Sequence, residues 1–168
     1  STLIGLIDED KDRAKKFVEE LAFVYRYLLQ SSEKPLIPLS EELAFIKAYY
    51  FLLKTRFDER LLLDIYVGNE IAQQMIPPLT LQILLENAVK HNIISQETPL
   101  HIVISEVNSN KVVISNTLQR RAQSVVSTQT GLANLAAKYQ LMQQPGPEIF
   151  ETQDKFSVQI TLLPNQAS

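Results

Sequence analysis

Three polar side chains on one predicted helix offer the chemistry in this sequence. Asn87, Lys90 and His91 are spaced i, i+3 and i+4, so they share one helical face, away from the leucines that should face the core. The carbonyl oxygen of an Asn suits Mg²⁺, which takes oxygen ligands and keeps several waters. Lys90 and His91 could both contact a phosphate. The spacing alone leaves an alternative open, in which Glu86 and Lys90 form a solvated i, i+4 pair and Asn87 is merely polar.

The composition argues against several other kinds of site. Cysteine is absent, which excludes disulfides, thiolate zinc sites, iron–sulfur clusters and a cysteine nucleophile. The two histidines, His91 and His101, are too few for a multi-histidine metal site. Sixteen basic residues against nineteen acidic ones give a net charge of −3, so we expect no nucleic-acid partner. The length of 168 residues predicts one domain, or one domain with an appendage.

The N-terminal residues suggest a piece of a longer protein. Residues 1–7 enter an apolar stretch directly and are too short and uncharged for a secretory signal. Elsewhere no apolar run approaches the roughly 20 residues that span a bilayer. We therefore expect any membrane segment to lie in parts of the parent protein outside this chain.

Helices and short strands alternate along the chain. The acidic residues at 8–10 favour a helix start there, and Ser40 is predicted to cap the next helix. That second helix is apolar on two sides, so it should lie between a sheet and a neighbouring helix. Strands that pair as hairpins, with helices between them, predict an α+β two-layer sandwich. Periodicity places helices at 8–31, 40–57, 79–94 and 131–142, and strands at 60–67, 100–106, 111–115, 149–152 and 156–163.

The segment Leu85-Glu-Asn-Ala-Val-Lys-His91 resembles the N box of bacterial sensor histidine kinases, in the form found in the LytS-like family. Other family blocks follow in order and spacing across nearly the whole chain. Each block alone is a weak signal, but their order and spacing together are strong. These blocks are Tyr25-Arg26-Tyr27, Leu39-Ser-Glu-Glu-Leu43, Tyr49, Arg56-Phe57, Ile76-Pro77-Pro78, Gln82, Gly131-Leu132-Ala133-Asn134 and Lys138-Tyr139.

The resemblance implies a GHKL-type ATP-binding fold, also called the Bergerat fold, over residues 35–168. Residues 1–34 would be part of the dimerisation helices, without the acceptor histidine. ATP would lie between the N-box helix and a lid formed by residues 117–130.

The resemblance also implies a role for each site residue. Asn87 would ligate Mg²⁺, and Lys90 and His91 would approach the phosphates. Asn116 stands where the family usually has an Asp that accepts from the adenine amino group, and as a neutral amide it is a weaker acceptor. The second glycine box would contribute Gly131 and Asn134.

Two glycine boxes of the family are degraded in this chain. Asn116-Thr117-Leu118 stands where Asp-Asn-Gly is expected, and the second box keeps only Gly131. Since glycine lets the backbone approach phosphate, we expect weak nucleotide binding. Arg120 and Arg121 could supply charge to the phosphates, or they could be solvated loop residues.

The resemblance implies a histidine protein kinase that uses ATP and Mg²⁺. It would pass the γ-phosphoryl group to a histidine outside this fragment and then to the receiver domain of a response regulator. The chain would be the homodimeric cytoplasmic portion of an inner-membrane sensor. The alternative is a non-catalytic interaction module of the same fold that has lost nucleotide binding. An ATPase like the type II topoisomerases or Hsp90 is disfavoured, because those proteins carry a Glu where this chain has Ile83. His91 belongs to the N box, so it is not the phosphorylated histidine, and His101 should be structural or exposed.

Overall fold

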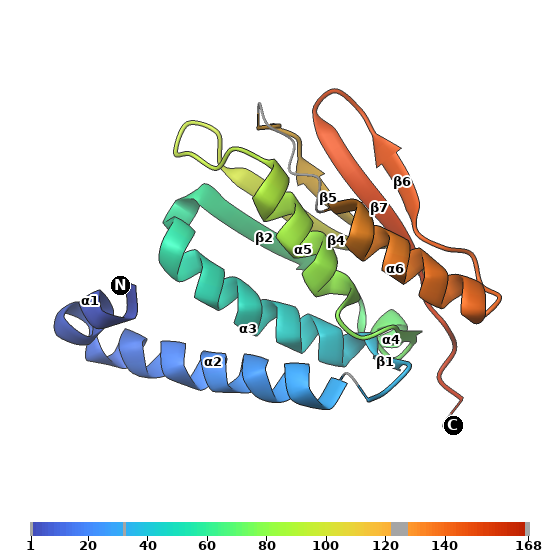
Figure 1. Ribbon diagram of the computed structural model, residues 1–168, viewed down its shortest axis with the longest axis horizontal. Helices are drawn as coiled ribbons and strands as arrows, with labels where there is room; N and C mark the ends of the chain where they lie inside the picture. Colours follow the sequence, from blue (N-terminus) through green and yellow to red (C-terminus); the bar gives the residue numbers. More distant parts are fainter. Residues whose placement is uncertain (1, 32, 122–127, 167–168) are drawn as a thin grey trace.

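The computed structural model describes residues 2–31, 33–121 and 128–166 of the chain. Helices cover one face of a five-stranded sheet whose strand order is β2-β4-β5-β7-β6 (Figure 1). The strands β2 and β4 pair in parallel, and the other neighbours pair antiparallel. The helices are α1 (Thr2–Glu9), α2 (Lys11–Ser31), α3 (Leu39–Phe57), α4 (Asn69–Ala72), α5 (Thr80–His91) and α6 (Thr128–Leu141), with a 3₁₀ turn, η1, at Asp58–Arg60. The strands are β1 (Ile37–Pro38), β2 (Leu61–Tyr66), β3 (Met75–Ile76), β4 (Leu100–Asn108), β5 (Lys111–Thr117), β6 (Glu148–Glu151) and β7 (Lys155–Thr161).

The main core lies between the sheet and the helices α3, α5 and α6. Alternate residues of β4 are buried, as the period of two in a strand requires: Leu100, Ile102 and Ile104 face the helices. Leu85 of α5 and Tyr139 of α6 fill the other side of this core. The α+β two-layer sandwich predicted from the sequence is therefore confirmed.

Helix α3 is buried on two sides, as its sequence predicted. Leu43 and Ile46 belong to the main core, whereas Phe45 and Ala48 pack against Val24 of α2. Helix α2 therefore runs along the outer side of α3, away from the sheet (Figure 1).

The prediction of one continuous helix over 8–31 is wrong in one respect, because the helix is interrupted at Asp10. Helix α1 ends at Glu9, and α2 begins at Lys11. The backbone N–H of Arg13 donates to Asp10 Oδ1 at 3.1 Å, and the N–H of Ala14 donates to the Asp10 carbonyl at 3.0 Å. Asp10 thus acts as an N-terminal cap of α2, which starts three positions later than predicted.

The predicted cap at Ser40 is also wrong. Helix α3 begins at Leu39, directly after β1, and the Leu39 N–H donates to the carbonyl of Gln74 at 2.8 Å. Because the backbone carbonyl of Gln74 already accepts from this first amide of α3, that amide needs no side-chain cap. The short strands β1 and β3, which pair antiparallel, and the four-residue helix α4 were not predicted, because segments of this length show no periodicity.

Two helix boundaries differ from the prediction by three residues, and the other ends of the same two helices differ by one. Helix α5 ends at His91 rather than at residue 94, because Asn92 takes an extended backbone conformation. Helix α6 begins at Thr128 rather than at Gly131.

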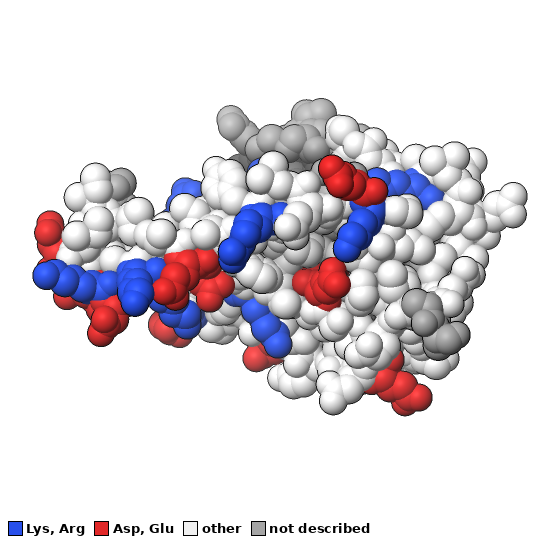
Figure 2. Space-filling model, turned by 90° about the horizontal axis from the view of Figure 1, so that it is seen from below, with Lys and Arg blue, Asp and Glu red and all other residues white. Residues whose placement is uncertain are grey.

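Charged side chains gather over the end of the molecule where α2 lies. In Figure 2, basic and acidic groups alternate along that end, and most of the remaining face is uncharged. Across the described residues, no helix combines the length and apolar character that a membrane crossing requires.

Candidate functional site

Helix α5 carries the predicted site and packs on β4 and β5. Leu81, Leu84, Leu85 and Ala88 are buried against the core. This packing fixes the rotation of the helix, so Asn87 and His91 lie on a different, half-buried side.

Two nitrogen atoms on this side of α5 are buried without a partner. Within the described part of the chain, neither Asn87 Nδ2 nor His91 Nε2 has a hydrogen-bond partner. The two residues are one helical turn apart, so these atoms belong to the same surface. A buried polar atom without a partner costs about 1–3 kcal/mol, so this surface is suited to a polar ligand.

The surroundings of His91 are cationic. Burial lowers the pKa of His91, and the positive charges of Lys90, Arg120 and Arg121 lower this pKa further. Charges of one sign that converge on a partly buried group attract the opposite charge. The end of α5 is therefore suited to an anion.

Asn92 ties the residues after β5 to the end of α5. This side chain is 2% exposed; its Nδ2 donates to the Ala88 carbonyl at 2.8 Å and its Oδ1 accepts from the Gln119 N–H at 2.6 Å. Arg121 completes the connection: its Nε donates to the Asn92 carbonyl and its N–H to the His91 carbonyl, both at 3.1 Å. Asn92 was not among the predicted site residues, although an Asn directly after a basic last turn is a signal for a helix end.

Arg120 and Arg121 are exposed, and each is anchored by a contact with another part of the chain. Arg120 is 62% exposed at its side chain and forms an ion pair with Glu151 of β6. Part of its charge is therefore already compensated, whereas Arg121 donates to backbone carbonyls and keeps its charge available.

The solvated pair between Glu86 and Lys90 does not form among the described residues. Glu86 Oε1 instead accepts from Tyr49 Oη of α3 at 3.1 Å and from Gln82 Nε2 at 3.0 Å. Lys90 is exposed and lies beside His91.

Asn116 lies near the end of β5 and is buried, 7% exposed. It alternates with Val112 and Ile114, so its side chain is on the face of the sheet that the helices cover. Its Nδ2 donates to the Thr117 carbonyl at 2.8 Å, which leaves Oδ1 as the atom that would accept from an amino group.

Gly131 lies in the first half of α6, against α5. A β-carbon at this position would be 2.9 Å from Ile83 Cγ2, closer than side chains tolerate. Asn134 is exposed one turn further along α6. Of the predicted lid, residues 122–127 lie outside the described residues.

The structure thus gathers most of the predicted site residues at one helix. Asn87, Lys90 and His91 are on α5, Arg121 contacts its end, and Gly131 packs against its side. Asn134 makes no described contact with this group. No set of three His, Asp or Glu side chains that could hold a metal occurs among the described residues.

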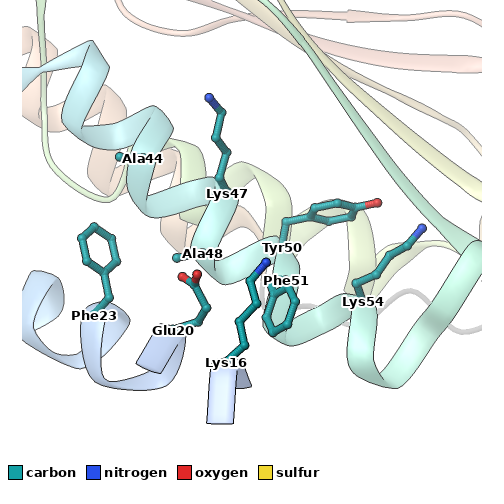
Figure 3. A pocket seen from close by; sticks show the side chains of 9 residues that line it. All are labelled: Lys16, Glu20, Phe23, Ala44, Lys47, Ala48, Tyr50, Phe51 and Lys54. Atoms are coloured by element: carbon teal, nitrogen blue, oxygen red, sulfur yellow. The ribbon is translucent and has the colours of Figure 1, made fainter. Parts of the chain in front are cut away.

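A separate groove of about 560 Å³ opens between α2 and α3 (Figure 3). It is lined by Lys16, Glu20 and Phe23 from α2, and by Ala44, Lys47, Ala48, Tyr50, Phe51 and Lys54 from α3. None of the predicted site residues contributes to it.

Comparison with known proteins finds sensor kinases. Residues 1–61 match the family model described as histidine kinase. The chain is 34% identical over 91 residues to the sensor protein LytS of Bacillus cereus, which covers 54% of this chain and 15% of that protein. It is 27% identical over 125 residues to the sensor histidine kinase/phosphatase LytS of Staphylococcus aureus, which covers 74% of this chain and 21% of that protein. The chain thus spans about a fifth or less of the length of these curated relatives.

Among solved structures, the histidine kinase domain of the Erythrobacter litoralis EL346 blue-light activated histidine kinase aligns with a TM-score of 0.49 at 14% identity. That alignment covers 89% of this chain and 75% of the other. The sequence matches confirm the resemblance predicted from the motifs.

Proposed function

We propose that this chain, which is similar in sequence to the LytS sensor histidine kinases, is the ATP-binding catalytic portion of such a kinase. The whole protein would transfer the γ-phosphoryl group of ATP to a histidine outside this chain, and from there to a response regulator. The ATP-binding portion would have the GHKL-type fold over residues 35–168, and residues 1–34 would belong to the dimerisation helices.

One observation carries the proposal for ATP. Asn87 and His91 present buried, unpartnered nitrogen atoms one turn apart, and the charges of Lys90, Arg120 and Arg121 converge on His91. A triphosphate provides the acceptor oxygens and the negative charge that this surface lacks.

The donor set also fits Mg²⁺. Mg²⁺ is usually bound through one or two protein oxygens together with waters and substrate phosphates, so a single Asn side chain suffices. Asn87 would be that ligand, once rotation about its terminal bond exchanges its amide nitrogen for its oxygen. When bound, the metal supplies charge neutralisation between phosphate oxygens.

The residues of this chain would act by positioning and by charge. Phosphoryl transfer needs little covalent help from the protein. Lys90, His91 and Arg121 would hold the phosphates, Asn116 Oδ1 would accept from the adenine amino group, and Gly131 and Asn134 would border the nucleotide from α6. Asn92 would fix the start of the lid to α5, through its contacts with Gln119 and Arg121.

The partners follow from the proposed kinase. We propose a homodimer that passes phosphate to a receiver domain, as the cytoplasmic portion of a parent held in the inner membrane by other segments. Residues of α1 and α2 would provide the dimer contacts, because Val18 and Tyr25 are 52% and 61% exposed.

Calorimetry with ATP and ADP, with and without Mg²⁺, tests the proposal. We expect weak binding that Mg²⁺ strengthens, because the glycine boxes are degraded. Asn87→Ala should remove the strengthening by Mg²⁺ and leave a residual, Mg²⁺-independent affinity. Gln82→Ala, a change on the same helix, is the control and should keep the Mg²⁺ effect. No heat and no thermal shift at millimolar nucleotide would instead favour the non-catalytic interaction module.

A further inference from the structure

A carboxylate of α3 lies at the N-terminal end of α5. Glu42 is fully buried, with 0% exposure, although it lies in the first turn of α3. Its Oε1 accepts from the backbone N–H of Leu81 at 3.3 Å. Burial raises the pKa of Glu42, and the hydrogen bonds from Tyr27 and from the backbone N–H groups of Leu81, Leu79 and Thr80 oppose this rise. Glu42 therefore caps a helix to which it does not belong.

Helix α5 depends on this external cap. Leu79 precedes it with φ at 67°, in the left-handed region, and its side chain provides no capping hydrogen bond. The first amides of a helix lack partners within it, and a non-glycine residue at positive φ is strained. The surroundings must hold this entry to α5 in place, and Glu42 provides the described side-chain contact with its amides.

The second oxygen of the same carboxylate accepts a hydrogen bond from a residue of α2. Tyr27 Oη donates a hydrogen bond to Glu42 Oε2. The Tyr27 ring stacks on Phe45 of α3 with ring centroids 4.2 Å apart. The Phe45 ring also stacks with Tyr49, with centroids 6.0 Å apart. Glu42 therefore receives one hydrogen bond from α2 and one from the start of α5.

The contact between α2 and α3 is uneven along its length. Val24, Phe45 and Ala48 form a buried cluster near Tyr27. Earlier in α2, the groove of about 560 Å³ lies between the two helices, with Lys16 and Glu20 on its wall (Figure 3). Tyr27 is thus at the closely packed part of this interface, where a change in the position of α2 would reach Glu42.

We propose that Tyr27 and Glu42 form a positioning pair, which couples the docking of α2 on α3 to the N-terminal turn of α5. Docked α2 places the Tyr27 hydroxyl on Glu42, and this bond holds the carboxylate against the amides of residues 79–81. When α2 leaves α3, Glu42 is released and the first turn of α5 loosens. The consequence for the nucleotide rests on the proposed function, because Asn87 and His91 lie on the same helix.

Coupling of this kind is reciprocal. If docking of α2 orders the start of α5, any ligand that orders α5 must strengthen docking of α2 by the same factor. Neither Tyr27 nor Glu42 would touch the nucleotide, so both are positioning residues.

Amide hydrogen exchange on the full chain without nucleotide tests the pair directly. Glu42→Leu keeps the approximate size of the side chain and removes both acceptor oxygens, and we expect it to speed exchange at Leu81 about tenfold, the size for one lost hydrogen bond. Tyr27→Phe keeps the ring on Phe45 and does not touch α5, and we expect it to speed exchange at Leu81 about threefold. Tyr66→Phe, which removes a hydroxyl at a 63% exposed position of β2, is the matched control and should change nothing.

The amides of Ile114 and Ile160, in the middle of the sheet, separate coupling from general destabilisation. They should exchange at the wild-type rate in Tyr27→Phe. Unchanged exchange at Leu81 in this variant would overturn the proposal, as would an equal increase at Ile114. When the changes at Tyr27 and Glu42 are combined, the free-energy effect on exchange at Leu81 should be smaller than the sum of the two single effects, because both changes break the same contact.

A second arm uses MgADP and keeps the two proposals distinguishable. In the wild type, MgADP should slow exchange in α2 around Tyr27, and Tyr27→Phe should abolish this effect while binding persists. Binding of MgADP with no effect on α2 in the wild type would overturn the coupling alone. Absence of MgADP binding would count against the proposed function, and the nucleotide-free exchange would still decide the role of the pair.

Discussion

Gly131 of α6 and Ile83 of α5 are in contact so close that a β-carbon at position 131 would be 2.9 Å from Ile83 Cγ2. Gly131, which we propose borders the nucleotide, therefore also has a packing role. Ile83 contributes an apolar side chain to the contact between the two helices. That contact gives no group to activate water.

Gly131→Ala should therefore destabilise the fold by about 1–3 kcal/mol, the usual cost of inserting a methyl group into a closely packed contact. The physical reason is that Ile83 is β-branched and stiff at χ1, so its Cγ2 cannot move away without shifting α5 or α6. Urea unfolding of the two proteins measures this cost.

Ile83→Ala provides the matched background. With Cγ2 removed, the change Gly131→Ala should become neutral or stabilise by up to about 1 kcal/mol, because Ala favours a helix over Gly. An equal cost of Gly131→Ala in both backgrounds would show that contact with Ile83 is not what requires the glycine.

The stability of the protein should fall as the pH decreases through the range in which His91 titrates. Burial and then the charges of Lys90, Arg120 and Arg121 lower the pKa of His91 below its unfolded value of about 6.5. The unfolded state therefore binds the proton more readily, so His91 contributes stability above pH 6.5 that is lost as the pH falls toward the folded pKa. Replacing His91 with Gln should flatten this part of the pH profile of unfolding.

Binding of nucleotide should raise the pKa of His91, which is lowered in the free protein. A bound phosphate adds negative charge beside the imidazole, which raises its pKa, so MgADP should bind with proton uptake near pH 6. The His91 resonances in NMR titrations with and without MgADP report this directly. A pKa of His91 that stays unchanged in saturating MgADP would place the phosphates elsewhere.

Exposed apolar residues on α1 and α2 should make the chain associate. Ile7, Val18 and Tyr25 are 49%, 52% and 61% exposed, and contiguous apolar surface on a helix indicates an interaction site. Sedimentation should show a concentration-dependent dimer, and Val18→Lys should weaken it at least about tenfold, because a buried unpaired charge opposes association. Leu141→Lys is the matched control, since Leu141 is an apolar residue of α6 that is 86% exposed. A monomer at high concentration would contradict the dimer.

Helices and strands whose apolar residues repeat with a clear period could be predicted from the sequence. Very short strands and the helix boundary at a capping residue could not. The two apolar sides of α3 indicated its place between α2 and the main core, and the alternation of residues 100–106 indicated β4. The break at Asp10 was missed because an acidic residue favours a first helical turn and a cap alike. The pairing of β1 with β3 depends on segments that are distant in the sequence, and two residues carry no pattern.

The candidate site shows the same division. The spacing of Asn87, Lys90 and His91 predicted their shared side of α5, because helical geometry alone determines it. The role of Asn92 depends on its contact with Gln119, which is 27 positions away in the sequence. The role of Glu42 depends on its contact with Leu81, which is 39 positions away. Tertiary contacts of this kind leave no periodic trace, and a buried glutamate in a first helical turn looks like an ordinary exposed one.

This chain alone should not phosphorylate itself, since neither of its histidines is placed to accept a phosphoryl group. His91 is on α5, where its Nε2 is buried among the groups proposed to hold the phosphates. A side chain that holds the nucleotide cannot also approach the γ-phosphorus in line from outside.

His101 lies on the other side of the sheet. It alternates with Leu100 and Ile102, which face the helices, so its side chain is on the opposite face, paired with Asp64. The sheet therefore separates it from α5 within one chain, and its ring nitrogen Nε2 is already engaged.

Incubation with ATP labelled at the γ-phosphate should leave the chain unlabelled, under conditions in which calorimetry shows that nucleotide is bound. The variants His91→Gln and His101→Asn identify the acceptor if label does appear. Acid-labile label lost in His91→Gln would overturn the assignment of His91 to the phosphate site. Label lost in His101→Asn would instead require phosphoryl transfer between chains, because only a second copy could bring ATP to the uncovered face of the sheet.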